Sequence, residues 1–348
     1  MKMKHKNILT SITAIALLSI CLTGCQANTD AETSSNDTST NTTTISNDTS
    51  TNNNSSVDST DNNSSVDYTE NNSSVDSTDN VITLNGSSIS AGTNVNVDGS
   101  TATIVTAGTY EIKGTLDDGQ IIVDTADEVT LVLNNTNITC STSSPLYIKE
   151  AENVTITLAE GSTNTITDGT AYDLIDPATD PDAALFSKSD MTINGTGSLI
   201  VNANYNDGIT SKDTLLIESG NISVTSTNHG IEGKDYLMVN GGSITVNAGG
   251  DGIKATNDME LSLGYIEINN GTLNITATDE GISAISGVKI TDGSISIATL
   301  NNGIKSDGTI DILGGTVEIQ TDDDGLVFTE KTIGDTAVVN VNGVAISE

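Results

Sequence analysis

The sequence has few aromatic residues and little proline. Aromatic side chains make up 3% of the 348 residues, tryptophan and arginine are absent, and proline occurs three times. This composition excludes a large core built around aromatic rings. Together with 32 glycines, it favours many short strands that stack small and β-branched side chains.

Positive charge and cysteine are scarce as well. All 12 basic residues are lysines, against 47 acidic residues, and the formal net charge is −35. Nucleic acids and anionic membrane surfaces would be repelled and are excluded as partners, and an anionic ligand would need a cation between itself and the protein. Only Cys140 lies outside the leader described next, which predicts a small core residue and no disulfide.

The first 25 residues have the features of a lipoprotein leader. A basic start with three lysines precedes an apolar run over residues 8–22, which is too short to span a bilayer comfortably. The run ends in Leu-Thr-Gly-Cys at residues 22–25, which resembles a lipobox, in which the cysteine is acylated and becomes the new N-terminus. We therefore predict a signal peptide over residues 1–24 and a lipid on Cys25, holding the protein on the extracellular face of the bacterial cell membrane. The alternative is an ordinary secretory leader with an accidental cysteine.

Residues 25–80 are predicted to form a disordered tether. They consist almost entirely of Asn, Ser, Thr and Asp and repeat a nine-residue unit, whose copies include residues 53–58, 62–67 and 71–76. One valine per unit buries too little apolar surface to offset the conformational entropy of the chain. A flexible chain of this length reaches about 40 Å. The folded domain is predicted over residues 81–348.

An internal repeat of about 22 residues fills most of the folded domain. A Gly-Ile or Gly-Leu pair marks each copy, at Gly208, Gly230, Gly252, Gly281, Gly303 and Gly325. The intervals between these marker glycines are 22, 22, 29, 22 and 22 residues, and a second set of glycines keeps the same register. Between the markers apolar and polar residues alternate, which predicts short strands with one buried face.

Stacking of these repeats predicts an all-β fold, a right-handed parallel β-helix with about 22 residues per coil. A single repeat is too small to close its own core, whereas stacked coils place equivalent residues about 4.8 Å apart. A leucine-rich repeat, the alternative at this period, needs a Leu/Asn pattern and an irregular return that are missing here. Residues 81–125, with hairpin-like strands such as 108–112, are predicted to form an N-terminal β cap.

Departures from the period predict insertions. Leu185 takes the position of Ile209 one coil earlier, 24 residues before it, and Leu146 takes the same position 39 residues before Leu185. The residues in excess of the 22-residue period include the acidic loop at residues 173–182. The 29-residue interval adds seven residues, which predict a bulge near residues 257–265.

The residue before each marker glycine is acidic in four of the six coils. This acidic column comprises Asp207, His229, Asp251, Glu280, Asn302 and Asp324, and Asp279 and Asp323 add carboxylates beside it. Stacked carboxylates repel each other by about 0.8 kcal/mol per pair in water and by about 3–4 kcal/mol at an effective dielectric of 20. Calcium, which takes oxygen ligands at about 2.3–2.6 Å, would compensate this repulsion by bridging adjacent coils. The alternative is a row of solvated Asp-Gly and Asn-Gly turns without an ion.

A second charged row follows about five residues later. It contains Asp213, Asp235, Asp258 and Asp307, with Lys188, Lys212 and Lys234 aligned on successive coils. These charges either neutralise one another or bind a sugar carboxylate. The candidate carbohydrate-binding residues are Lys212, Lys234, Lys254, Lys305 and Tyr205. A tyrosine at a coil edge has packing as its alternative role.

Several motifs resemble one bacterial family. The runs Asn-Tyr-Asn-Asp-Gly-Ile-Thr-Ser-Lys-Asp at 204–213, Gly-Ile-Glu-Gly-Lys-Asp at 230–235 and Gly-Gly-Asp-Gly-Ile-Lys at 249–254 are similar to the clostridial carbohydrate-binding domain family, polysaccharide-lyase-like right-handed β-helices on bacterial surfaces. The likeness spans residues 100–330. It implies binding of acidic plant polysaccharide such as polygalacturonate, with calcium in the coil turns, and it adds Asp258 to the calcium candidates.

The sequence thus predicts a monomeric, non-catalytic surface protein that binds pectin-like polysaccharide through calcium. His229 departs from the Asp or Asn expected of the family, which argues against a calcium site on that coil. One rival hypothesis is a calcium-dependent polysaccharide lyase with one of the four candidate lysines as base, although acidic surroundings raise the lysine pKa that such a base needs lowered. Another is a structural or adhesive protein without a glycan ligand. The lack of tryptophan argues against neutral glucans, which usually bind on flat aromatic platforms.

Overall fold

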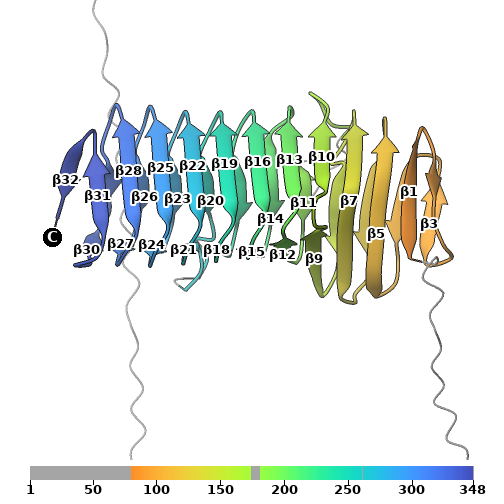
Figure 1. Ribbon diagram of the computed structural model, residues 1–348, viewed down its shortest axis with the longest axis horizontal. Coiled ribbons are helices and arrows are strands. Elements are labelled where there is room, and N and C mark those ends of the chain that lie inside the picture. The colour runs from red at the N-terminus through yellow and green to blue at the C-terminus, as the bar shows by residue number, and fades with distance from the viewer. Residues whose placement is uncertain (1–79, 174–180, 261, 348) are drawn as a thin grey trace, which may run out of the picture. The chain divides into compact units, whose positions relative to one another are not determined.

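The computed structural model describes residues 80–173, 181–260 and 262–347, which wind into a parallel β-helix. The coils follow one another along the horizontal axis of Figure 1, from β1 (Val81–Gly86) to β32 (Val344–Ile346). The predicted all-β class and parallel β-helix are confirmed. No described residues form a helix long and apolar enough to cross a membrane. The predicted signal peptide, Cys25 and the tether up to residue 79 lie outside the described residues.

Each regular coil contributes one strand to each of three parallel ladders. The first ladder consists of β4 (Thr101–Ile104), β6 (Gln120–Asp124), β8 (Leu146–Glu150), β11 (Ala183–Ser187), β14 (Asp207–Ser211), β17 (Ile231–Gly233), β20 (Ile253–Ala255), β23 (Ile282–Ala284), β26 (Ile304–Ser306) and β29 (Leu326–Val327). The second consists of β9 (Asn153–Leu158), β12 (Asp190–Gly195), β15 (Thr214–Ile217), β18 (Tyr236–Val239), β21 (Tyr265–Ile268), β24 (Gly287–Ile290), β27 (Thr309–Ile312) and β30 (Glu330–Ile333). The third consists of β10 (Thr163–Asp168), β13 (Ser198–Ala203), β16 (Asn221–Ser226), β19 (Ser243–Ala248), β22 (Thr272–Ala277), β25 (Ser294–Thr299), β28 (Thr316–Thr321) and β31 (Val338–Val341).

The second and third ladders join through long strands at the N-terminal end. β7 (Val129–Cys140) pairs with β9 through its first half and with β10 through its last residues. β5 (Gly108–Leu116) pairs in parallel with both β1 and β7. The two ladders therefore belong to one continuous sheet, whereas the first ladder is a sheet of its own.

The strand register follows the sequence repeat. Ile209 pairs with Ile231, and the equivalent pairs continue coil by coil to Leu326. The irregular coils obey the same rule, because Leu185 pairs with both Ile209 and Leu146. Nine residues separate β20 from β21, where two separate β17 from β18 in the coil before. The predicted alignment of the early coils and the predicted bulge are therefore confirmed.

Isoleucine, leucine and valine fill the inside of the coils in stacked columns. One such column is Ile222, Ile244, Leu273, Ile295 and Val317, each at most 2% exposed. Burying one such side chain contributes roughly 1.5–3 kcal/mol to stability. The lone Cys140 is buried as well, as predicted.

The two glycine sets of the repeat have different causes. A Cβ atom on the marker glycine Gly252 would lie 2.3 Å from Cγ2 of Ile275, so a side chain there would displace the core. Gly242 belongs to the second set and has a φ of 95°, which side-chain-bearing residues rarely adopt. The first set therefore permits close packing of the third ladder, and the second permits a tight turn.

Antiparallel hairpins end the coil stack. β1 pairs with β2 (Ile89–Ser90), β3 (Val95–Asp98) pairs with β4, and β31 pairs with β32. The N-terminal β cap is confirmed, but its predicted extent over residues 81–125 is too long, because residues 108–116 and 120–124 lie in the parallel strands β5 and β6. Alternation of apolar and polar residues predicts a strand without telling whether its neighbours are parallel or antiparallel.

Candidate functional site

The acidic column lies where the chain leaves the third ladder and enters the first. The amides of the first five marker glycines donate to the carbonyl of the column residue one coil further on, as Gly208 does to His229 and Gly252 to Glu280, both at 2.9 Å. The predicted stacking of the column on successive coils is therefore confirmed. What the column binds is a separate question, which depends on its side chains.

Three side chains of the column accept hydrogen bonds from the backbone of the next coil. Asp207 Oδ1 accepts from the His229 amide, and His229 Nδ1 accepts from the Asp251 amide, both at 3.0 Å. Asp251 Oδ1 accepts from the Glu280 amide at 3.1 Å. An acceptor at these positions satisfies a buried N–H group, which gives the column a structural role that needs no ion.

Lysines of the first ladder neutralise part of the column. Lys254 Nζ lies 2.7 Å from Asp251 Oδ2 and 3.2 Å from Nε2 of His229. Burial lowers the pKa of His229, and the Lys254 charge lowers it further, so the imidazole is neutral and can accept a hydrogen bond. Lys305 Nζ lies 2.9 Å from Glu280 Oε1, and this hydrogen bond raises the pKa of Lys305.

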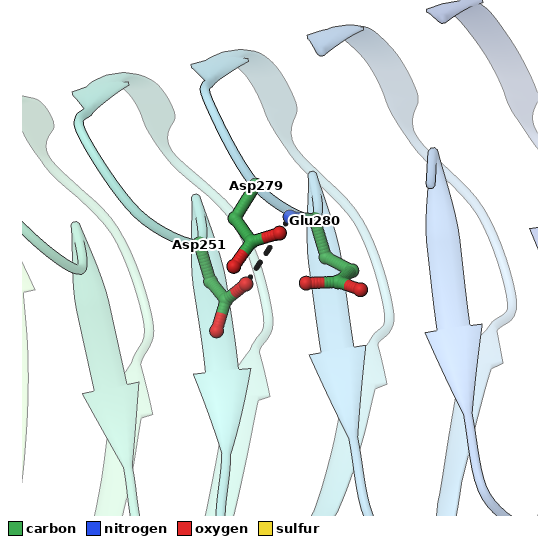
Figure 2. A group of neighbouring side chains, drawn as sticks. All are labelled: Asp251, Asp279 and Glu280. Carbon is green, nitrogen blue, oxygen red and sulfur yellow. Dashed lines mark hydrogen bonds between the residues drawn. The ribbon is translucent and has the colours of Figure 1, made fainter. Parts of the chain in front are cut away.

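Asp251, Asp279 and Glu280 form a carboxylate cluster between two coils (Figure 2). Each offers an oxygen within 4.8 Å of the others. Asp251 and Glu280 are 4% and 6% exposed, whereas Asp279 is open to solvent. The hydrogen bond from the Glu280 amide to Asp251, drawn as a dashed line, holds the two coils' acidic turns together.

The carboxylate cluster fits a calcium ion. One oxygen of each carboxylate lies within 4.8 Å of those of the other two, which is about twice a calcium–oxygen distance of about 2.4 Å. Three carboxylates supply up to six oxygens, and hard cations such as calcium prefer oxygen ligands. Within the described part of the chain, no other three acidic, histidine or cysteine side chains meet this closely.

The other four predicted metal residues lie away from the carboxylate cluster. Asp207 is two coils from Asp251, with His229 between them. Asp323 and Asp324 lie two coils beyond Asp279 and Glu280 in the other direction. Asp258 lies in the bulge, in a hollow that it shares with Glu260 and Asp307. The structure thus brings together three of the seven residues.

Asp207 sits in a second group of charges. Burial, with smaller contributions from the carboxylates of Asp182 and Glu232, raises the pKa of Asp207 to about 7, although the hydrogen bond from the His229 amide acts to lower it. Lys212 Nζ lies 3.3 Å from Asp182 and 3.9 Å from Glu232. An ammonium group therefore already occupies the space between these two carboxylates.

Comparison with known proteins identifies the family. A model of the family described as carbohydrate-binding domain-containing protein matches residues 98–343. The chain belongs to this carbohydrate-binding domain family. A curated relative of the same description from Acetivibrio thermocellus is 45% identical over 137 residues, which are 37% of this chain and 48% of the relative. The chain thus spans about half the length of that relative.

A solved structure is similar to this chain as well. The structure of the polysaccharide lyase-like protein from C. thermocellum, a gadolinium derivative, is 33% identical and superposes with a TM-score of 0.62. The match covers 75% of this chain and 96% of the other. The polysaccharide-lyase-like β-helix fold implied by the sequence motifs is therefore confirmed.

The predicted carbohydrate-binding residues do not form one site. Lys254 and Lys305 border the carboxylate cluster, whereas Lys212 and Lys234 follow Ser211 and Gly233 at the opposite end of the short first-ladder strands. Tyr205 stacks on Tyr172 with ring centroids 4.2 Å apart, so it packs against the protein itself. The binding role of all five stays a prediction.

Several partners of the site were not predicted. Asn301 donates to Asp279 at 2.6 Å, and Asn302 donates to Glu280 at 3.2 Å. Their spacing of 22 residues from the two acids is the sequence signal that could have identified them.

Proposed function

We propose that the protein binds acidic polysaccharide such as polygalacturonate through calcium held by Asp251, Asp279 and Glu280, and that it does not cleave the polymer. The observation that carries this proposal is the meeting of three carboxylates within 4.8 Å in a chain of a carbohydrate-binding domain family. The side-chain amides of Asn301 and Asn302 donate to Asp279 and Glu280 and so orient two of the three carboxylates. Calcium would supply positive charge at this point and no redox chemistry.

The overall charge supports a bridging cation. With a net charge of −35, the protein repels a polymer that carries a carboxylate on every sugar. A divalent ion that shares its coordination shell between protein and polymer replaces that repulsion by attraction. A bridging ion of this kind favours acidic over neutral polysaccharide as the ligand.

The lysines favour binding over cleavage. A lyase base must lose its proton before it can abstract one from the sugar, which requires a lowered lysine pKa. The pKa of Lys305 is instead raised by its bond to Glu280, and Asp251 holds the Lys254 ammonium at 2.7 Å. Charged lysines beside a calcium site suit contacts to sugar carboxylates.

The cell envelope is the proposed location. Acylation of Cys25 would anchor a monomer to the outer side of the cell membrane. The polar segment up to residue 80 would then hold the β-helix at a distance from the lipid surface. This part of the proposal depends on the leader sequence alone. It suits a ligand that is too large to enter the cell.

A binding assay with polygalacturonate tests the proposal. The full chain is incubated with the insoluble polymer in calcium or in chelator, and the bound fraction is measured. We expect binding in calcium only. Asp279→Asn should weaken calcium-dependent binding by at least about tenfold because it removes a charged ligand. Glu330→Gln, which removes an exposed charge elsewhere, is the control and should bind like the parent.

Two outcomes would contradict the proposal. Equal binding in calcium and in chelator would show that no calcium ion bridges the protein and the polymer. Release of unsaturated oligosaccharides, measured by their absorbance and lost in Lys254→Met or Lys305→Met, would make the protein a lyase.

A further inference from the structure

A groove crosses the C-terminal ends of β19, β22, β25 and β28, which lie side by side in the third ladder (Figure 1). Its volume is about 650 Å³, within the range of about 300–1,000 Å³ that is typical of ligand sites. Asn247, Thr276, Ala298 and Gln320 pair in this order on the four strands. The three steps of about 4.8 Å between these four residues span about 14 Å along the helix axis. An occupant that uses the whole length of the groove is therefore linear.

Small and apolar residues form the floor and one edge of the groove. Ala298 stands in the row where its neighbours Thr276 and Gln320 carry longer side chains, which leaves a hollow at β25. Leu300 is 62% exposed beside it. A pyranose ring has C–H groups on its faces, so a sugar can cover both residues.

The walls of the groove carry groups that can bind sugar hydroxyls. Asn247, Thr276, Thr278 and Gln320 are exposed, and their side chains form no hydrogen bond with another described residue. Among the lining residues, all of which are described, Asp322 alone is charged. The groove is thus a nearly neutral strip on a strongly acidic protein, where a polyanion meets the least repulsion.

The groove ends beside the carboxylate cluster. Thr278 lines the groove, and the next residue of the chain is Asp279. We propose that a linear polyuronate chain lies in this groove along the helix axis, with its carboxylates within reach of the calcium ion at Asp279. This inference rests on the proposed function and adds the binding face. The lining then contacts hydroxyls and ring faces while the ion holds the charge.

Two tryptophan substitutions on one strand test the binding face. Ala298→Trp fills the groove at an exposed strand position, and Ser294→Trp places the same side chain four residues earlier on β25, outside the lining. Affinity for oligogalacturonides in calcium is measured by calorimetry. We expect Ala298→Trp to lower it by about tenfold or more and Ser294→Trp to leave it unchanged. Both variants should keep the parent's calcium affinity. Leu300→Asp, which adds a repelling charge at the edge, should weaken oligogalacturonide binding as well.

The outcomes separate this inference from the proposed function. If the parent does not bind oligogalacturonides in calcium, the proposed function fails. If the parent binds and both Ala298→Trp and Leu300→Asp bind as tightly, the groove is not the binding face although the function stands. Loss of binding in Ser294→Trp as well would also overturn the inference, because the effect would not be specific to the groove.

Discussion

Replacing Asp207 by asparagine isolates the cost of a buried charge in the acidic column. Asp207 is 3% exposed, and its Oδ1 accepts hydrogen bonds from the His229 amide and the Asn228 side chain, both at 3.0 Å. Asparagine keeps an oxygen for both donors and removes the charge. The variant should therefore fold with the same contacts and differ mainly in electrostatics.

The size of this electrostatic cost follows from the pKa of Asp207. Burial raises the pKa of Asp207 from an ordinary value of 3.8 to about 7. Between these values the folded protein holds a proton that the unfolded chain has lost, so stability falls as the pH rises through this window and is constant above it. At about 1.4 kcal/mol per tenfold change in the ionisation constant, the loss is about 4 kcal/mol. This is a large part of a typical unfolding free energy of about 5–15 kcal/mol.

Denaturant unfolding in chelator at several pH values measures this effect. Asp207→Asn should gain about 4 kcal/mol relative to the parent between pH 4 and pH 8. The matched control is Asp292→Asn, at an exposed turn where the carboxylate accepts a bond from the Gly293 amide at 2.8 Å. The control should follow the parent at every pH. A stability difference between Asp207→Asn and the parent that does not change with pH would refute the reasoning.

Two further predictions concern the ion and the anchor. Lys254→Met removes an ammonium group that competes for Asp251 and should raise calcium affinity by about tenfold in calorimetry, whereas Lys289→Met, which breaks an ion pair with Glu267 in the second ladder, should not. Unchanged affinity in Lys254→Met would mean that calcium binds elsewhere. Cys25→Ala should give unprocessed precursor or released protein on cell fractionation, and mature protein in the membrane fraction would contradict the lipoprotein prediction.

The repeat could be predicted from the sequence because each coil buries the same residues. The interval between Ile209 and Ile231 is the length of one turn of the β-helix, and the core requires that turn to close at the same position every time. Even the 39-residue step from Leu146 to Leu185 was predictable, since both occupy the same buried position.

The chemistry of the site was less predictable because it depends on where side chains point around a turn. The sequence predicted that Asp207 and Asp251 lie in one column. It did not reveal that a neutral His229, which lies between them, accepts a hydrogen bond from the Asp251 amide. Nor did the period reveal that Lys254 and Lys305 reach back to the column from the neighbouring strands. The repeat gives the residue spacing between coils, but it does not give the side-chain conformations that bring Lys254 to Asp251 within one coil and Lys305 to Glu280 on the coil before.

The charges around the carboxylate cluster explain why an ion would be needed for polyuronate binding. Asp251, Asp279 and Glu280 carry three negative charges, and Lys254 and Lys305 carry two positive charges beside them. The remaining charge of −1 repels a sugar carboxylate but is small enough for the fold to tolerate without metal. One calcium ion would change the local charge to +1, which would attract the carboxylate. The lysines thus do more than neutralise the column. They leave the cluster with a net charge of only −1, so that one divalent ion would be enough to make it positive.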